Sequence, residues 1–191
     1  MYTFEEWKKN LIIVRGGGDI ATGTIYKLYQ SRFPVLVLEI ANPSCIRRTI
    51  SFCEAVFDKK VEVEGVTAKR AESLEDAFAI YGQGQIPVMI DENGSMIQEV
   101  QPPVVVDAIL AKRNLGTKIT DAPAVIGVGP GFCAGKDVDA VIETQRGHNL
   151  GRVIYEGEAA PNTGIPGMIG GYAKERVIHA EVEGTVHQIK K

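Results

Sequence analysis

The chain contains the run Leu11-Ile-Ile-Val-Arg-Gly-Gly-Gly-Asp-Ile-Ala-Thr-Gly23, from which the type of fold is predicted. Its first part, Leu11–Val14, is a short uninterrupted apolar run, which is typical of a central strand in a parallel sheet. Three glycines follow, and from Asp19 to Ser31 apolar residues recur at helical spacing. We therefore predict a strand, a tight glycine turn and a helix, which together form the first unit of an open α/β sheet.

The glycine turn has the spacing of a dinucleotide-binding site. Such a turn needs a glycine for the bend, a second where the backbone meets a pyrophosphate, and a small third residue where the helix packs on the strand. Gly16, Gly18 and Ala21 occupy these positions, with Gly17 between the first two. The free N–H groups and the dipole at a helix start favour an anion. We predict a phosphate-binding turn; a tight turn without a ligand is the alternative.

An acidic residue stands where a ribose would need it. A second apolar strand, Val35–Leu38, ends on Glu39, which follows Gly18 by 21 residues. In dinucleotide sites an acid at about this distance accepts hydrogen bonds from ribose hydroxyls. Asp19 lies beside the expected anion. Arg15 directly precedes the glycines, and its positive charge compensates for the negative charge of Asp19. These two charges leave the identity of the ligand open.

The rest of the chain continues the alternation of strands and helices as far as residue 135. We predict helices over 45–57, 73–81 and 108–112, and strands over 61–63, 86–90, 104–107 and 124–128. This order predicts a Rossmann-like nucleotide- or phosphate-binding domain over 1–135 with an open parallel sheet. From 136 to 191 the pattern is β-rich, with paired strands over 137–144 and 151–155. This C-terminal segment looks truncated, because it stops within a strand-like run.

Two further groups of residues are candidate ligand contacts. Gly129 and Gly131 follow a core strand with Lys136 nearby, which favours a second anion-binding loop; a plain glycine-rich connection is the alternative. Arg146 and His148 lie in a turn. Arginine binds phosphate or carboxylate groups through two hydrogen bonds, and histidine changes its charge near neutral pH. Ligands bind beyond the carboxyl ends of parallel strands, so we expect both glycine loops to border one crevice.

The cysteines and histidines give no metal motif. Cys45, Cys53 and Cys133 are spread along the chain without a Cys-x-x-Cys pair, which is typical of free thiols in a reducing compartment. His179 and His187 stand eight residues apart without an evident third ligand. We therefore predict no metal site.

Composition excludes several functional classes. The 191 residues include 21 Lys and Arg against 24 Asp and Glu, for a net charge of −3, so the basic excess of a nucleic-acid-binding protein is missing. No apolar run approaches the roughly 18 residues of a membrane span. The charged start of the chain lacks the apolar core of a signal peptide. We expect a cytoplasmic protein without a nucleic-acid or membrane partner.

Four sequence blocks resemble one protein family. Val14–Gly23, Pro43–Phe57, Gly127–Asp137 and Val141–Arg152 are similar to segments of the YqeB-type family of selenium-dependent molybdenum hydroxylase maturation proteins. That family is more distantly similar to the Rossmann portion of XdhC-type chaperones, which insert sulfurated molybdenum cofactor. The resemblance implies an accessory protein that has a molybdenum hydroxylase apoenzyme as partner and a dinucleotide or the molybdenum cofactor as ligand. It implies no catalytic residues, and it implies further sequence beyond residue 191.

Two other functions stay open at this point. An NAD(P)-dependent oxidoreductase fits the glycine turn and Glu39 but needs a proton donor. Tyr172 and Lys174 have the wrong spacing to share one helix face for that purpose. A non-catalytic nucleotide sensor fits the same turn. The sequence does not decide whether the chain is an enzyme.

Overall fold

The computed structural model describes residues 2–165 and 167–184. The chain divides into two compact units between Pro161 and Asn162. The second unit is short and contains one 3-10 turn, η3 (Lys174–Arg176), and an isolated bridge between Ile169 and Tyr172. The first unit contains the sheets and all the candidate ligand contacts named above.

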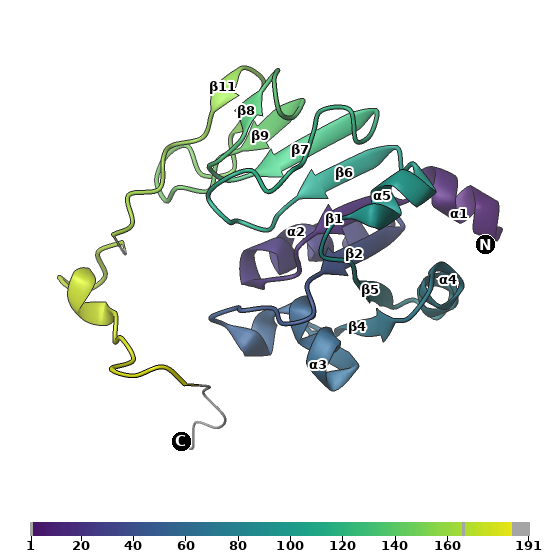
Figure 1. Ribbon diagram of the computed structural model, residues 1–191, viewed down its shortest axis with the longest axis horizontal. Coiled ribbons are helices and arrows are strands. Elements are labelled where there is room, and N and C mark those ends of the chain that lie inside the picture. Colours follow the sequence, from purple (N-terminus) through teal and green to yellow (C-terminus); the bar gives the residue numbers. More distant parts are fainter. Residues whose placement is uncertain (1, 166, 185–191) are drawn as a thin grey trace. The chain divides into compact units, whose positions relative to one another are not determined.

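Nine strands form one sheet in the first unit (Figure 1). Seven neighbouring strands are parallel, and the two edge strands, β10 and β3, run antiparallel to their neighbours. The α/β class predicted from the sequence is therefore confirmed. A separate small sheet pairs β8 (Cys133–Ala134) with β11 (Gly157–Glu158). In spatial order the strands of the large sheet are β10 (Val153–Ile154), β9 (Ala140–Ile142), β7 (Ala124–Val128), β6 (Val104–Asp107), β1 (Ile12–Arg15), β2 (Val35–Glu39), β5 (Ile86–Ile90), β4 (Val66–Ala71) and β3 (Lys60–Val63).

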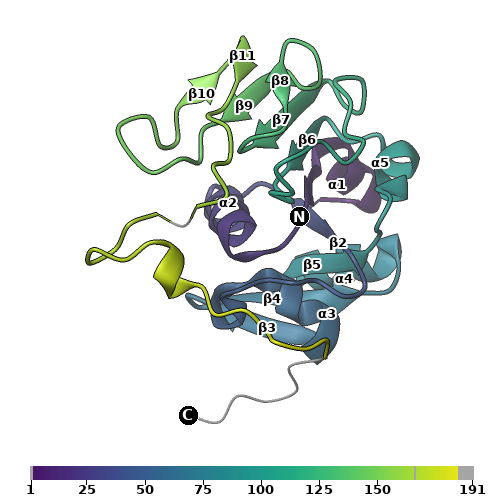
Figure 2. The same ribbon diagram turned by 60° about the vertical axis from the view of Figure 1, so that its left-hand side comes forward.

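The strand order reverses at β1. From β1 the chain continues to β2 and β5 on one side, then crosses to β6, β7 and β9 on the other. Figure 2 shows the two ends of the sheet, with β9 and β10 at one end and β3 and β4 at the other. The order β5-β2-β1-β6-β7-β9 is that of Rossmann folds, which bind ligands beyond the carboxyl ends of the strands beside the reversal. The glycine turn directly follows β1 and therefore lies at this place.

Successive residues of each central strand point to opposite faces of the sheet and pack in two hydrophobic layers. Ile13 packs in the layer covered by α1 (Phe4–Asn10), α4 (Leu74–Gly82) and α5 (Ser95–Val100). Ile12 and Val14 pack in the opposite layer with α2 (Asp19–Gln30) and α3 (Ala55–Asp58). Both faces of β1 are thus buried, which explains why its sequence is apolar without alternation. Burial of each such side chain stabilises the folded state by about 1.5–3 kcal/mol relative to leaving it exposed.

Several predicted elements are confirmed and several are not. The strands at β1, β2, β5, β6 and β7 lie where the sequence places them, and α4 begins after Ser73, whose Oγ accepts the N–H of Asp76 at 3.2 Å. The helices α1 and α5 and the strand β4 were not predicted. The expected strand over 61–63 is one half of the β3–β4 hairpin.

The predicted helix over 45–57 is wrong. Two 3-10 turns, η1 (Arg48–Ile50) and η2 (Phe52–Glu54), precede the short α3 instead. The N–H of Cys53 donates to the carbonyl of Gly17 at 2.8 Å, and the N–H of Phe52 donates to Thr22 Oγ1 at 2.9 Å. Since these backbone groups bond to the glycine turn and to α2, they do not continue a helical ladder.

The predicted helix over 108–112 is also wrong. Leu110 and Lys112 have φ of 58° and 63°, which a right-handed helix does not accommodate. The segment after β6 is an irregular loop that extends to β7.

Beyond residue 135 the chain continues the large sheet. The strands predicted over 137–144 and 151–155 pair as the antiparallel β9 and β10. Residues 185–191 lie outside the described residues, and they include His187 and most of the strand-like end predicted over 183–191. Among the residues that are described, no helix has the length and apolar character to cross a membrane.

Candidate functional site

Gly16 is required by its backbone conformation and its packing, and Gly17 is tightly packed. Gly16 has φ of +89°, and a Cβ there would lie 2.9 Å from the Cα of Ile109. A Cβ on Gly17 would lie 3.1 Å from the backbone nitrogen of Cys53. The N–H of Gly16 donates to the carbonyl of Leu38 at 2.8 Å. The turn is therefore enclosed between the loop after β6 and the η2 turn.

Gly18 differs from its neighbours. Its φ is −63°, which any residue adopts, and a Cβ built there meets no atom within 4 Å. Gly18 is the N-cap of α2 and provides no side-chain cap. Neither backbone conformation nor protein packing requires glycine at this position. Because a helix cannot satisfy the N–H groups of its own first turn, those of Asp19 and Ala21 are left for water or a ligand.

The carboxylate of Asp19 is held by two donors. Its Oδ1 accepts the N–H of Ile20 at 2.9 Å, and its Oδ2 accepts Arg47 Nε at 2.5 Å. The side chain of Arg47 is 58% exposed. A guanidinium has five N–H donors, so Arg47 neutralises Asp19 and still keeps donors for a ligand at the surface.

Glu39 lies against the glycine turn. Its Oε2 accepts the N–H of Gly17 at 2.7 Å, and its Oε1 accepts the N–H of Ile40 at 2.8 Å. Burial raises the pKa of Glu39, and these two N–H groups partly oppose that shift. An ionised carboxylate has about four acceptor positions. Two positions therefore remain for hydroxyl groups such as those of a ribose.

Arg15 belongs to a buried polar cluster. Its Nη1 donates to Thr117 Oγ1 at 2.5 Å and lies 3.4 Å from Asp107 Oδ2, to which Thr117 Oγ1 donates at 2.5 Å. The charge of Arg15 is thus balanced by Asp107, which is its register partner on β6. Sequence reasoning did not identify Asp107 and Thr117. The signal for Asp107 was present, since this acid ends an apolar strand as Arg15 does.

The second glycine loop packs against the loop after β6. A Cβ on Gly131, which has φ of +111°, would lie 2.6 Å from the Cα of Arg113. A Cβ on Gly129 would lie 2.9 Å from Leu110 Cδ2. The same loop contacts Gly16 through Ile109. Both glycine loops therefore border one segment, 108–113, at the carboxyl ends of β1, β6 and β7.

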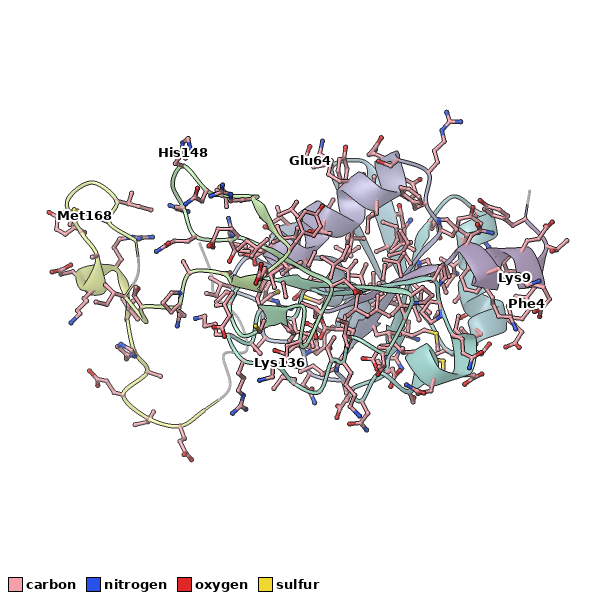
Figure 3. The ribbon with its side chains drawn as sticks, turned by 90° about the horizontal axis from the view of Figure 1, so that it is seen from above. Phe4, Lys9, Glu64, Lys136, His148 and Met168 are labelled. Carbon is pink, nitrogen blue, oxygen red and sulfur yellow. The ribbon has the colours of Figure 1, made fainter. Side chains whose placement is uncertain are left out.

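Lys136, Arg146 and His148 are exposed. Lys136 lies in the connection between β7 and β9, and the other two lie in the loop between β9 and β10. Figure 3 shows Lys136 and His148 on opposite sides of the sheet. The structure does not bring these two side chains together.

Two cysteines lie side by side next to the glycine turn. The sequence does not predict this contact. The Sγ atoms of Cys45 and Cys53 are 3.3 Å apart, and burial raises the pKa of the Cys53 thiol. In the predicted helix, residues eight positions apart would be separated by about 12 Å along the axis. The 3-10 turns that replace this helix bring the two thiols together. All three cysteines are free thiols.

No family model matches the chain, and no solved structure matches it. Among curated proteins, the chain is similar to "Uncharacterized protein YqeB" of Escherichia coli (strain K12), with 52% identity over 174 residues. These residues cover 91% of this chain and 32% of that protein. The chain thus spans about one third of the length of its relative, whose name states no activity. The similarity supports the YqeB-type resemblance seen in the sequence blocks.

We expect Gly16→Ala to destabilise the first unit by about 1–3 kcal/mol, because the added Cβ forces a strained φ against Ile109. Gly23→Ala is the matched control, since Gly23 lies in α2 and a Cβ there meets nothing within 4 Å. This control should gain about 0.5–1 kcal/mol from helix propensity. Urea denaturation followed by circular dichroism measures both changes. Equal stabilities of the two variants would contradict the packing described for Gly16.

Proposed function

We propose that this chain binds a nucleotide or another phosphate-bearing cofactor, with a phosphate seated at the start of α2. The observation that carries the proposal is the open space beside Gly18. Gly16 and Gly17 are explained by contacts within the protein, whereas Gly18 is not. Glycine is tolerated at an N-cap, and at the start of a helix that follows a parallel strand it also lets a ligand approach the backbone closely.

The surroundings of Gly18 suit an anion. The helix α2 has 12 residues, and its aligned peptide dipoles place roughly half a positive charge at the N-terminus. The N–H groups of Asp19 and Ala21 supply donors, and Arg47 supplies a cationic group that already neutralises Asp19. These features together favour a phosphate over a neutral ligand.

Glu39 favours a ligand with a ribose. Its carboxylate is fixed by Gly17 and Ile40, so its two remaining acceptor positions are oriented in advance. A dinucleotide fits this arrangement, because its phosphate accepts hydrogen bonds from the N–H groups at the start of α2 and its ribose hydroxyls donate to Glu39. Glu39 also supports the second candidate, an NAD(P)-dependent oxidoreductase. An absorbance assay of nicotinamide oxidation or reduction with candidate substrates distinguishes the two. Turnover indicates the oxidoreductase, and binding without turnover indicates a protein that only binds the nucleotide.

We further propose that the chain acts as an accessory protein in the maturation of a molybdenum hydroxylase. This role rests on the resemblance of four sequence blocks to the YqeB-type family. On this proposal the ligand is the molybdenum cofactor or a dinucleotide form of it, and the partner is the hydroxylase apoenzyme.

The binding proposal is tested by calorimetric titration with ADP, NAD⁺ and a pterin dinucleotide. We expect saturable binding of at least one of them by the unmodified chain. Gly18→Asp should weaken it about tenfold or more, because the new carboxylate takes the N–H groups and the charge position of the phosphate. Asp is a favourable N-cap, so this variant should keep its stability.

Gly23→Asp is the matched control, because it adds the same charge to the same helix about 7.5 Å further along. It should bind as the unmodified chain does. Absence of binding by every nucleotide and pterin would overturn the proposal, as would equal affinities of the two variants.

The maturation proposal is tested in cells that make a molybdenum hydroxylase. Deletion of the gene that encodes this chain should lower hydroxylase activity without lowering the amount of hydroxylase protein. The complete gene carrying Gly23→Asp should restore activity, and the one carrying Gly18→Asp should not. Unchanged hydroxylase activity after the deletion would contradict this role.

A further inference from the structure

Three side chains with metal-binding chemistry converge beside the glycine turn. The Sγ atoms of Cys45 and Cys53 are 3.3 Å apart, and Cys45 Sγ lies 3.6 Å from Glu54 Oε1. Cys53 and Glu54 are buried, whereas Cys45 is half-buried. Within residues 2–165 and 167–184 this is the one place where three such groups bring their ligand atoms within 4.8 Å of one another.

The fold holds Cys53 in position through its backbone. The N–H of Cys53 donates to the carbonyl of Gly17, and the neighbouring Phe52 is fixed by Thr22 Oγ1. Thr22 Oγ1 also donates to the carbonyl of Gly17 at 3.2 Å. The second thiol of the pair therefore lies at a place set by the glycine turn and α2, and does not depend on a mobile surface loop.

Arg48 holds the carboxylate of Glu54. Its Nε lies 3.0 and 2.9 Å from the two carboxylate oxygens, and its Nη2 donates to Oε2 at 2.6 Å. A metal-ligating carboxylate is commonly fixed by such an outer hydrogen bond. With Arg48 in this position, Oε1 remains directed to the thiol of Cys45.

Two of the three distances between ligand atoms are close to those of a tetrahedral ion with sulfur and oxygen ligands. Zn–S bonds of about 2.3 Å and Zn–O bonds of about 2.1 Å at tetrahedral angles give an S···O separation of about 3.6 Å and an S···S separation of about 3.8 Å. The distance from Cys45 Sγ to Glu54 Oε1 already has the first value. The two Sγ atoms need to separate by only about 0.5 Å to reach the second.

We propose that Cys45, Cys53 and Glu54 form a binding site for a thiophilic divalent cation such as Zn²⁺. Thiolate ligands select such ions over Mg²⁺ and Ca²⁺, which take oxygen ligands. Three protein ligands leave the fourth tetrahedral position for water or another ligand, as in zinc sites that bind substrates. This site does not depend on the phosphate site, although both are attached to the same glycine turn.

The proposal is tested with Co²⁺ as a spectroscopic probe, added to the purified, untagged chain under reducing, oxygen-free conditions. We expect one Co²⁺ per chain, near-ultraviolet thiolate-to-cobalt absorption and the visible bands of tetrahedral cobalt. Addition of Zn²⁺ should remove these bands. Cys45→Ser should weaken binding about tenfold or more and reduce the thiolate absorption, because one of two sulfur ligands is lost.

Cys133→Ser is the matched control, because Cys133 lies on β8 in the separate small sheet and is not part of this cluster. It should bind Co²⁺ as the unmodified chain does. Glu54→Gln should keep the thiolate absorption while binding more weakly. Cys53→Ser should also weaken binding about tenfold or more. Circular dichroism shows whether each variant is folded, and if Cys53→Ser is not folded because Cys53 is buried, Cys45→Ser alone provides the test.

Two outcomes would overturn the proposal. One is a reduced chain, with both thiols titratable, that gives no Co²⁺ bands and takes up no Zn²⁺. The other is folded Cys45→Ser that retains the absorption and affinity of the unmodified chain.

Discussion

The peptide groups of Gly17 hold the central part of this structure together. The N–H of Gly17 donates to Glu39 at the end of β2, and its carbonyl accepts the N–H of Cys53 and the hydroxyl of Thr22. One residue thus joins the turn after β1 to the next strand, to α2 and to the η2 turn. A Cβ at this position would lie 3.1 Å from the backbone nitrogen of Cys53, so a side chain there would force this tight contact to shift.

This constraint places two kinds of chemistry next to each other. On one side of the turn, Gly18 and the start of α2 are open to an anionic ligand. On the other side, Cys53 is held beside Cys45 and Glu54. A bound phosphate and a bound cation would therefore share one structural support. The buried pair of Arg15 and Asp107 joins β1 to β6 at the strand reversal, directly before the glycine turn.

The sequence predicts the parts of the fold that local chemistry determines. The apolar runs of β1, β2, β5, β6 and β7 and the cap at Ser73 are read correctly, because burial on both faces and a helix start leave direct signals. The spacing from Gly18 to Glu39 likewise places that acid against the turn. The helical periodicity over 45–57 does not give a helix, because tertiary hydrogen bonds with Gly17 and Thr22 replace the helical ones. The contact of Cys45 with Cys53 depends on the same bonds, so no local pattern shows it.

Amide chemical shifts show whether a phosphate binds at the start of α2. In a ¹H–¹⁵N spectrum of the chain titrated with ADP, the N–H resonances of Gly18, Asp19 and Ala21 should move the most, as expected when they donate to phosphate oxygens. The same resonances should not move with adenosine, which lacks the phosphate. Saturation of ADP binding with no shift at these three residues would mean that the phosphate does not bind at the start of α2.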